Sequence, residues 1–513
     1  MLTSLLRPSG VLADRPYAGS SLLALGLALM LTSPSAEAGV GTQVLKLSFS
    51  DAADPVDSLA RTFTVRQNGG RQQPLRLSCQ EQGGKQELHQ RSLSARTEQT
   101  ATLRGFKAST SYQCWVETLS DAYRVRTPSR SFTTAVLPID LKPPVISRAS
   151  TDVARTGYML YNYATLKRFW TIKNRYLVIL DPEGNVRWFY KGEGGGDVDV
   201  SWLGNDRVLM GGFHDYSIEA TIVGLDKKTY FKDAMEVTSQ YEQADSANHD
   251  AGLSEDGQSI FTFGYLSNGT YSSFLIRQLD IATGKVIWTW SGIEDGAELG
   301  QLPAGSSSDT DPHHANAIDD QWEDGRLYLY VSMRNQNQMM KLDYETGEVI
   351  WKLGVGGDFT LLEKDGTPAT DDRWFFNNHD AKMYGPNLFA VHDNGTERAN
   401  YGGVNYSRGL QLELDQEAMT ARIKFEYTEP NWVEPIWSGY DVYPDGRSLV
   451  AIGHCWLCTS QKVASIIELD PVGQVLWRAD MTNEKEHLYR AERIDGCDIF
   501  NNLTYCPAGR QKQ

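Results

Sequence analysis

The sequence predicts an all-β fold, a six-bladed β-propeller preceded by a small β-sandwich. Three observations lead to this prediction. The 513 residues include 46 Gly and 11% aromatic residues, a composition typical of strands joined by many tight turns. Residues 43–135 alternate polar and apolar side chains in short, closely spaced stretches. The chain after them repeats one strand–turn–strand pattern six times, with a period of one propeller blade or a little more.

The N-terminus has the features of a signal peptide. Arg7 and Arg15 precede the apolar run SSLLALGLALMLTS, and Ala36 and Ala38 occupy the small positions of a cleavage site. Residues 1–38 are therefore predicted to be a signal peptide that is cleaved after Ala38. The run is too short for an ordinary transmembrane helix, and no other stretch could span a bilayer. We expect a periplasmic or secreted protein.

Residues 43–138 are predicted to form the β-sandwich. Apolar and polar residues alternate in VLKLSFS, RTFTVRQ, LRLSC and SYQCWVETL, as expected for strands with one buried face. The stretch LRGFKASTSYQCWVETLSD resembles the late hairpin of a fibronectin type III domain. The Pro-rich LPIDLKPPVIS predicts a linker, and the propeller domain is expected to span residues 150–513.

Six cysteines follow the predicted signal peptide. An even number in an exported protein favours disulfides, and Cys79 and Cys114 are predicted to pair within the sandwich. The order HCWLC excludes a haem attachment site, because the histidine precedes the cysteine pair. A Cys₄ zinc site is the weaker alternative, since the two late pairs are spaced differently. The later cysteines can form disulfides in three ways: Cys455, Cys458, Cys497 and Cys506.

Six hairpins define the repeat of the propeller domain. Each has a strand, a tight turn opened by Asp, and a return strand, as in VILDPEGNVRWFY and MKLDYETGEVIWKLG. One such unit cannot bury both of its faces, whereas six arranged radially can, and no long edge is left exposed. A solenoid or two sandwiches is the alternative arrangement. The turn residues are Asp181, Asp226, Asp280, Asp343, Asp415 and Asp470.

A second element, a polar residue followed by a strand, a turn and a strand, lies between these hairpins. Its leading residue is His249, His314, His379 or Ser438, and Asp199 stands near that place in the first repeat. If this position begins the innermost strand of each blade, the three histidines converge at one mouth of the propeller. Nothing about propeller packing requires imidazole there, so we predict a functional site.

The histidine cluster leaves two kinds of chemistry open. With Asp199, Asp250 or Asp380 the histidines could hold a transition metal, or they could bind and transfer an anionic group. Arg334 closes the hairpin that His314 opens, so it is expected beside that histidine. A guanidinium would repel a metal cation but offers a fork of donors to an oxyanion, which favours anion chemistry.

Several stretches of this sequence resemble the bacterial arylsulfate sulfotransferases, the periplasmic class that does not use a nucleotide sulfate donor. The most specific are HAN followed by SMRNQ, then ETGEVIWKLG, then NHDAKMYGPNLFAVHDNG. The resemblance runs from about residue 45 to the C-terminus and includes the sandwich and the propeller. His392 stands where the family has an apolar residue, and Ser438 stands where it has Thr.

The resemblance implies a role for each site residue. His379 matches the nucleophile that becomes sulfurylated. His249, His314, Asn316 and Arg334 match the groups that hold the sulfuryl oxygens, and Ser438 is a weaker match to a substrate-binding residue. The implied reaction moves a sulfuryl group from a phenolic sulfate ester to a phenol by ping-pong chemistry through a sulfohistidine. It needs no metal and no other cofactor.

The remaining expectations concern partners and alternatives. The formal charge of −16 argues against binding of nucleic acid and against broad contact with anionic membranes. The resemblance implies small phenolic partners, a sulfate-ester donor and a phenol acceptor. The family includes dimers, which leaves a homodimer open. A non-catalytic propeller that binds a sulfated or other anionic partner, and a metal-dependent propeller hydrolase, are the alternative functions. Aromatic residues near the cluster could line the phenol site: Trp374, Phe375, Phe376, Tyr401 and Trp437.

Overall fold

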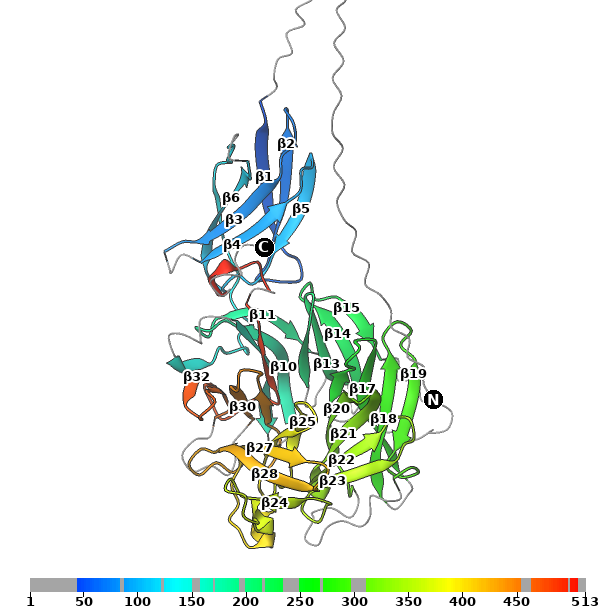
Figure 1. The fold of residues 1–513 in the computed structure, drawn as a ribbon. Coiled ribbons are helices and arrows are strands. Elements are labelled where there is room, and N and C mark those ends of the chain that lie inside the picture. The colour runs from blue at the N-terminus through cyan, green and yellow to red at the C-terminus, as the bar shows by residue number, and fades with distance from the viewer. Residues whose placement is uncertain are drawn as a thin grey trace, which may run out of the picture. The chain divides into compact units, whose positions relative to one another are not determined.

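The protein is all-β, as predicted, in the part of the chain that the computed structural model describes. These residues are 44–83, 87–120, 124–149, 157–168, 171–192, 199–214, 217–233, 249–267, 271–296, 311–453, 463–496 and 499–505. Leu45–Gln513 forms one compact unit. Figure 1 traces the strands along the chain. Among the described residues, no helix is long and apolar enough to cross a membrane. The predicted signal peptide and the four late cysteines lie outside the described residues.

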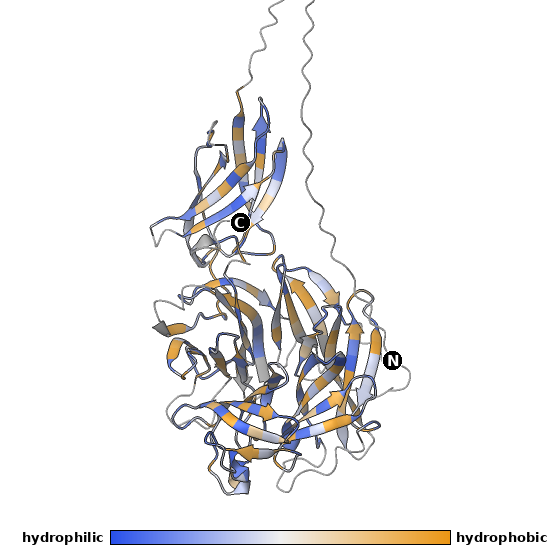
Figure 2. Ribbon diagram, viewed as in Figure 1, coloured by the Kyte–Doolittle hydropathy of each residue, from blue (hydrophilic) through white to orange (hydrophobic). Residues whose placement is uncertain are grey.

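Two antiparallel sheets form the N-terminal part. One has the order β1-β2-β5, and the other has the order β4-β3-β6-β7. Their bounds are β1 Lys46–Ala53, β2 Arg61–Asn68, β5 Glu98–Leu103, β4 Leu88–Leu93, β3 Leu75–Glu81, β6 Ser111–Thr118 and β7 Arg130–Thr133. Hydropathy alternates along these strands in Figure 2. Alternate side chains therefore point to one face, where residues such as Phe63, Leu77 and Val116 form a shared core.

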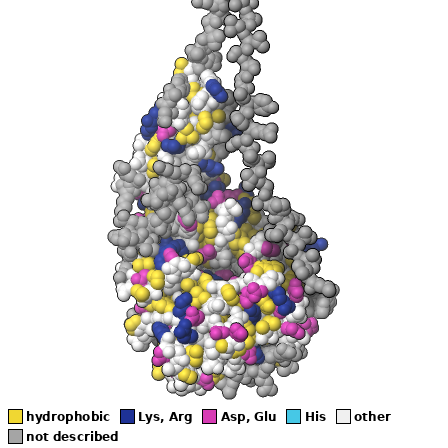
Figure 3. Space-filling view, in the orientation of Figure 1, with side chains coloured by type: hydrophobic (Ala, Val, Ile, Leu, Met, Phe, Trp, Pro, Cys, Tyr) yellow, Lys and Arg dark blue, Asp and Glu magenta, His cyan; other side chains and the backbone are white. Residues whose placement is uncertain are grey.

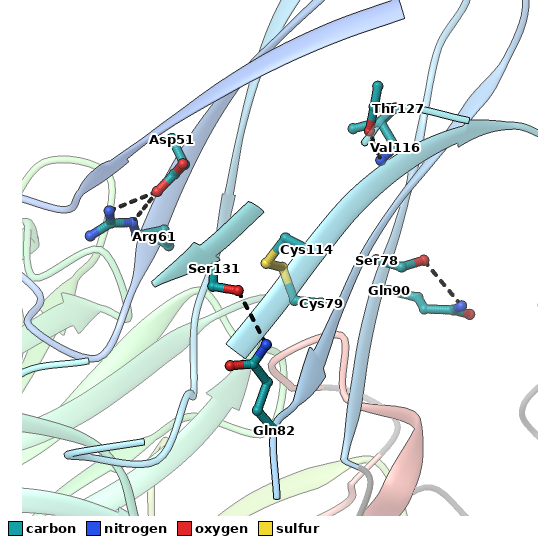
Figure 4. The surroundings of a disulfide bond; sticks show 10 residues. All are labelled: Asp51, Arg61, Ser78, Cys79, Gln82, Gln90, Cys114, Val116, Thr127 and Ser131. Atoms are coloured by element: carbon teal, nitrogen blue, oxygen red, sulfur yellow. Dashed lines mark hydrogen bonds and ion pairs between the residues drawn. A yellow bond between two sulfur atoms is a disulfide. The ribbon is translucent and has the colours of Figure 1, made fainter. Parts of the chain in front are cut away.

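The predicted disulfide between Cys79 and Cys114 is confirmed. The two residues are directly opposite in the β3–β6 ladder, and their Cα atoms are 4.0 Å apart. Figure 4 shows the bond among the polar contacts of this region, including the bond from Val116 N to Thr127 Oγ1. The disulfide joins two strands of one sheet and does not bridge the two sheets.

Six further sheets of four or five strands follow, which we number 1 to 6 in chain order. Nearly all neighbouring strands are antiparallel; β24 and β28 are parallel. Sheet 1 contains β9 Tyr158–Arg168, β10 Thr171–Leu180, β11 Val186–Lys191, β33 Glu486–His487 and β34 Ala491–Ile494. Sheet 2 contains β12 Val200–Gly204, β13 Arg207–His214, β14 Ser217–Gly224 and β15 Thr229–Lys232. Sheet 3 contains β16 Ala251–Leu253, β17 Ser259–Ser267, β18 Ser272–Asp280 and β19 Val286–Ser291.

Sheets 4 to 6 repeat the same order of strands. Sheet 4 contains β20 Ala315–Glu323, β21 Arg326–Met333, β22 Gln338–Asp343 and β23 Val349–Gly354. Sheet 5 contains β25 His379–Met383, β26 Leu388–Asp393, β27 Arg408–Asp415, β28 Thr420–Tyr427 and β24 Thr360–Leu362. Sheet 6 contains β29 Gly439–Val442, β30 Ser448–Ile452, β31 Ser465–Leu469, β32 Val475–Asp480 and β8 Val145–Ala149. Short 3₁₀ turns are η2 Arg334–Gln336, η3 Asp371–Arg373, η4 Arg398–Tyr401 and η5 Leu503–Tyr505.

The turn aspartates act as predicted in all six outer hairpins. Each carboxylate accepts a hydrogen bond from a backbone N–H two to four residues further along, which closes the turn. The donors to Asp181, Asp226 and Asp280 are Asn185 N at 2.8 Å, Lys228 N at 3.2 Å and Thr283 N at 2.7 Å. The donors to Asp343, Asp415 and Asp470 are Thr346 N, Ala418 N and Gln474 N, at 2.9, 2.9 and 2.7 Å.

The six sheets pack against one another in a closed cycle. Separate apolar clusters join sheet 1 to 2, 2 to 3, 3 to 4, 4 to 5 and 5 to 6. A further cluster joins sheet 6 to sheet 1, where Leu449 and Ile466 meet Tyr161 and Tyr176. The first strands follow the same order, with contacts from β12 to β16, β16 to β20, β20 to β25 and β25 to β29. Each sheet therefore buries both faces against its two neighbours.

Two strands from opposite ends of this region close the cycle. β8, near its start, pairs with β32 at the edge of sheet 6. β34, near its end, pairs with β9 in sheet 1. The predicted linker ended at Ser147, so its last residues belong to β8. Both closures join segments about 330 residues apart in the sequence.

Candidate active site

The residues predicted to lead the inner strands lie at matching places. His249 stands two residues before β16, His314 stands directly before β20, and His379 opens β25. Ser438 directly precedes β29, and Asp199 directly precedes β12. Since the first strands of successive sheets contact each other, these positions converge on one region of the molecule.

The backbone is left-handed at three of these five positions. His249 has φ 52°, His314 has φ 47° and Ser438 has φ 79°. A residue with a Cβ atom in this conformation carries a strain of about 1 kcal/mol or more, and such residues cluster at functional sites. A left-handed residue turns the chain sharply before the strand begins. The repeated turn thus brings the leading side chains of different sheets together.

Three histidines meet in this region. The Nε2 atoms of His249 and His314 are 3.2 Å apart, and their ring centroids are separated by 5.0 Å. The rings of His249 and His379 are 6.2 Å apart and perpendicular. His379 is buried, whereas His314 keeps 29% of its side chain accessible. The cluster therefore extends from a buried imidazole to one that solvent can reach.

The hydrogen bonds of His379 define its tautomer. Its Nδ1 lies 2.7 Å from Asn394 Oδ1 and 3.2 Å from the Asn377 carbonyl oxygen. The Asn394 amide is oriented by its own Nδ2, which donates to the carbonyls of Glu434 and Trp437. Both neighbours of Nδ1 are acceptors, so Nδ1 carries the hydrogen and Nε2 keeps its lone pair.

His314 has a carboxylate partner that the sequence analysis did not single out. Its Nδ1 is 2.5 Å from Asp311 Oδ2, and its backbone N–H donates to Asp311 Oδ1 at 3.1 Å. Nδ1 therefore carries a hydrogen. The other ring nitrogen faces His249, so a proton can be shared across the 3.2 Å contact between the two imidazoles. Asp311 stands three residues before His314, in DPHHAN.

Arg334 lies beside His314, where the hairpin argument predicts it. Its backbone N–H donates to the His314 carbonyl oxygen at 3.2 Å. The guanidinium donates to Asn335 Oδ1 at 2.7 Å and to the Pro435 carbonyl oxygen at 3.1 Å. Its charge acts on both His249 and His379. The site thus contains a fixed cation next to the imidazoles.

Asn316 is buried under His379. Its Nδ2 donates to the Asn378 carbonyl oxygen at 2.7 Å, and its Oδ1 accepts from Ser332 Oγ at 2.9 Å. Ser332 Oγ in turn accepts from Asn378 Nδ2 at 2.6 Å. This network fixes the residue that immediately precedes His379. The sulfuryl-binding role predicted for Asn316 would use its second amide hydrogen.

Ser438 is also buried, and both of its oxygens have partners. The hydroxyl oxygen accepts from Gly453 N at 2.9 Å, and the carbonyl oxygen accepts from the Arg490 guanidinium. Arg490 and its neighbour Tyr489 belong to the short segment between β33 and β34. The ring of Tyr489 lies 6.0 Å from His249 and 6.2 Å from His379. These two residues are part of the site, although no local pattern in the sequence marks them.

The electrostatic environment keeps the buried imidazoles neutral. Burial, then the charges of Arg334 and Arg490, hold the pKa of His379 well below its usual value near 6.5. Burial, then His314, Arg490 and Arg334, lower the pKa of His249 in the same way. A neutral imidazole has a lone pair available for attack or for accepting a proton.

The aspartates considered as metal ligands are engaged elsewhere. Asp250 accepts from Ile318 N at 2.8 Å, and Asp380 accepts from Tyr440 N at 2.8 Å. Asp380 and Asp199 also face Arg490, at 3.2 and 3.6 Å from its Nε. Within the described ranges, no three His, Cys, Asp or Glu side chains gather as a metal site.

The aromatic candidates are mostly core residues. Trp374, Phe375 and Phe376 are buried in the apolar cluster that joins sheets 4 and 5. Trp437 is buried and stacks on His487 with ring centroids 4.4 Å apart. Tyr401 is partly buried and packs on Phe376. Tyr489 is the aromatic ring found within about 6 Å of two site histidines.

A comparison with known protein families identifies the family to which this chain belongs. The model of the arylsulfotransferase (ASST) family matches residues 148–490. The chain belongs to the arylsulfotransferase family. The match includes strands of all six sheets, although β34 and the start of β8 lie outside it, and it includes every residue of the site described above, with Arg490 as its last position. A search of curated proteins finds no match.

Membership in the arylsulfotransferase family establishes the general reaction class, the transfer of a sulfuryl group from or to an aryl compound. The three histidines, Arg334 and the buried Asn316 all lie within the matched range. On the face that Figure 3 shows, the described basic and acidic side chains are interspersed without a large basic patch. Small-molecule substrates fit the sulfotransferase family.

Proposed function

We propose that this arylsulfotransferase moves a sulfuryl group from a phenolic sulfate ester to a phenolic acceptor through an N-sulfohistidine at His379. The observation that carries the proposal is the tautomer of His379. Asn394 and the Asn377 carbonyl occupy Nδ1, so the free lone pair is on Nε2 of a buried, neutral imidazole. A nucleophile needs that lone pair, and the two cations nearby suit an anionic sulfuryl group.

The proposed reaction has two balanced half-reactions. His379 Nε2 attacks the sulfur of the donor ester, an N–S bond forms, and the S–O bond to the aryl group breaks with its electron pair leaving on the phenolate. In the second half, the oxygen of the acceptor phenol attacks the same sulfur. The N–S bond breaks, and its electron pair returns to Nε2. Splitting one transfer into two steps produces ping-pong kinetics.

Charge on the sulfuryl oxygens grows during each transfer, and fixed donors would stabilise it. Arg334 supplies a guanidinium, and Asn316 supplies an amide hydrogen. In comparable sites, removal of one such donor costs roughly 10²- to 10³-fold in rate. Ser438, whose hydroxyl and carbonyl oxygens already accept protein hydrogen bonds, is the weaker substrate-binding candidate.

His314 is the better candidate for general acid and base than His249. Its Nδ1 is held by Asp311, and 29% of its side chain is accessible, so it can exchange a proton with solvent. Protonated His314 would give a proton to the departing phenolate and would take one from the acceptor. His249, whose pKa is lowered by burial and by His314, would stay neutral and would accept a hydrogen bond from protonated His314.

The six sheets that pack in a closed cycle support a six-bladed propeller as the full architecture, with β8 and β34 closing it. The domain division predicted at residues 43–138 and 150–513 is part of the same proposal, with the start of the propeller moved back to include β8. We also propose export to the periplasm or the outside through the N-terminal signal sequence, with small phenolic partners, no cofactor, and a homodimer as an open possibility. The apolar N-terminal run and the early disulfide support export.

Intact-protein mass spectrometry tests the proposal directly. EDTA-treated protein is mixed briefly with p-nitrophenyl sulfate, alongside His379→Ala. We expect an acid-labile gain of one SO₃ per chain that added phenol removes and that the variant lacks. His392→Phe is the matched control, because His392 pairs with His379 across the β25–β26 ladder but packs on Trp432.

Two other outcomes would change the proposal. A folded wild-type protein with no adduct and no phenol-dependent turnover would discard covalent transfer and favour an anion-binding protein. Sulfate-ester turnover that EDTA abolishes and a divalent metal restores would favour a metal-dependent hydrolase.

A further inference from the structure

Arg490 is a buried cation that has no assigned role in the two half-reactions. It is 3% exposed. Its Nε lies 3.2 Å from Asp380 Oδ1 and 3.6 Å from Asp199 Oδ1. One terminal nitrogen donates to the Ser438 carbonyl oxygen, and the other donates to Tyr489 Oη at 3.3 Å. Each of its three nitrogens therefore has a protein partner.

These partners come from different parts of the cycle of sheets. Asp199 precedes β12 in sheet 2, Asp380 belongs to sheet 5, and Ser438 precedes β29 in sheet 6. Arg490 follows β33 in sheet 1, where Asn162 Oδ1 accepts from its backbone N–H at 2.8 Å. The guanidinium of Arg490 thus contacts the starts of the inner strands of sheets 2, 5 and 6. It holds them against the C-terminal segment that completes sheet 1.

The same residue orients the aromatic ring next to the histidines. The guanidinium lies over the ring of Tyr489, with its Cζ 4.0 Å from the ring centroid. That ring stacks near His249 and meets His379 edge-on. A cation over an aromatic face is attractive, and the hydrogen bond to Tyr489 Oη adds direction. Movement of Arg490 would therefore release the ring.

We propose that Arg490 is a positioning residue of the sulfuryl-transfer site: a buried cation, fixed by Asp380, Asp199 and Ser438, that holds Tyr489 against His249 and His379 and acts on both imidazoles through its positive charge. This proposal rests on the nucleophilic role of His379. It assigns to the C-terminal closing segment a direct part in the chemistry. A residue that only closed the fold would affect stability without affecting the protonation of His379.

The electrostatic part of the proposal follows from the charges around His379. A cation disfavours protonation of a neighbouring imidazole, and Arg490 acts in this sense on both His379 and His249. Arg490 is always a cation, and Asp380 is its counter-charge. Burial would raise the pKa of Asp380, but Arg490 and Lys382 outweigh it and hold that pKa below its usual value. Among the described residues, the titratable and charged groups that contact or act on the two histidines are His314, Tyr489, Arg334 and Arg490. Further groups act on these: Asp311 contacts His314, Asp199, Asp250 and Asp380 act on Arg490, and Lys382 acts on Asp380.

The pH dependence of kcat/KM for the phenolic donor tests this role. Because His379 must be neutral to attack, activity falls in acid through the pKa of the free enzyme's nucleophile. In the wild type this acid limb is expected well below pH 6.5. Arg490→Gln should move it upward by roughly one pH unit or more. Arg490→Lys keeps the positive charge but cannot form the same set of hydrogen bonds. It should therefore lower kcat and leave the pH of the acid limb unchanged.

Arg493→Gln is the matched control. Arg493 lies in β34, only three residues away, and its guanidinium pairs with the buried Glu468 away from the histidines. Its loss should reduce stability and leave the acid limb unchanged. An unchanged limb in Arg490→Gln, or an equal shift in Arg493→Gln, would overturn the proposal. If Arg490→Gln does not fold, Arg490→Gln with Asp380→Asn removes the buried ion pair as a unit. A smaller upward shift is then expected, because the negative charge of Asp380 is removed together with the cation.

Histidine NMR separates this proposal from the proposed function. With ¹³C-labelled histidine, the resonance that His379→Ala removes should begin to titrate at higher pH in Arg490→Gln than in the wild type. That shift can be measured even in a protein with no sulfuryl-transfer activity. An active wild type whose His379 titration is the same in Arg490→Gln would contradict the role of Arg490 alone. An inactive wild type would contradict the role of His379 as a nucleophile.

Discussion

At the scale of single residues, the site depends on side chains that accept a hydrogen bond from Nδ1 of a histidine and thereby fix the tautomer of the imidazole. Asn394 orients His379 so that Nε2 is the reactive nitrogen, and Asp311 holds His314 through Nδ1. The histidines could be predicted from the sequence because they recur at one place in the repeat. Asn394, Asp311 and Arg490 could not, because their roles depend on contacts between side chains and not on spacing along the chain.

The Asp311 contact leads to a prediction about leaving groups. If Asp311 supports proton donation by His314, Asp311→Asn should matter most when the departing phenolate is strongly basic. We expect little change with p-nitrophenyl sulfate and a loss of roughly 10²-fold with unsubstituted phenyl sulfate. Single-turnover rates of the first half-reaction provide the measurement.

Asp319→Asn is the control for this comparison. Asp319 lies in β20 near the same sheet edge, but its carboxylate accepts from Met383 N at 3.0 Å and does not contact His314. It should leave the ratio of the two rates unchanged. Equal losses with both esters in Asp311→Asn would show that Asp311 maintains the structure and does not assist proton transfer.

At the scale of elements, the outer hairpins could be predicted almost completely. Each turn is encoded locally, by an aspartate whose carboxylate caps a backbone N–H within four residues. The left-handed residues before the inner strands could not be predicted, since histidine adopts φ above zero more often than most residues with a Cβ atom but still only uncommonly. Glycine would occupy these two positions with less strain, so we attribute the presence of histidine there to function and not to the conformational preference of the residue.

This strain predicts that glycine and alanine variants differ in stability in opposite directions at His314 and at His379. At His314, with φ 47°, His314→Gly should be about 1 kcal/mol more stable than His314→Ala, because alanine keeps the Cβ clash that glycine lacks. At His379, which opens strand β25, His379→Gly should be less stable than His379→Ala by roughly 0.5–1 kcal/mol. Urea unfolding of the four variants measures both differences. The same sign at both positions would contradict the strain argument.

At the scale of the whole molecule, closure was the part that the sequence could not predict. β8 joins sheet 6 and β34 joins sheet 1, and both pairings link segments about 330 residues apart. A second long-range junction connects the N-terminal sheets to sheet 1. There Arg187 of β11 is fully buried and binds Glu87 at 2.5 and 2.7 Å, while Asn502 and His89 bind the same carboxylate.

The Glu87 junction predicts how stability depends on pH. Burial alone would raise the pKa of Glu87, but Arg187 and His89 outweigh it and hold the pKa well below its usual value. A carboxylate with a lowered pKa in the folded state contributes stability that is complete above the unfolded pKa near 4.3 and is lost as the pH falls below it. Glu87→Gln should therefore be less stable than the wild type by roughly 3 kcal/mol at pH 7.

The difference in the free energy of unfolding between the wild type and Glu87→Gln should become smaller in acid. Below about pH 4 it should fall by about 1.4 kcal/mol per pH unit, because the unfolded wild-type chain takes up a proton that the folded chain does not. Urea unfolding at pH 7, 4 and 3 measures it. Glu98→Gln is the control: its partner Arg66 and Glu98 itself are about half exposed, so this variant should behave like the wild type at every pH. A difference for Glu87→Gln that stays constant from pH 7 to pH 3 would mean that the Glu87 carboxylate is not the charged centre of this junction.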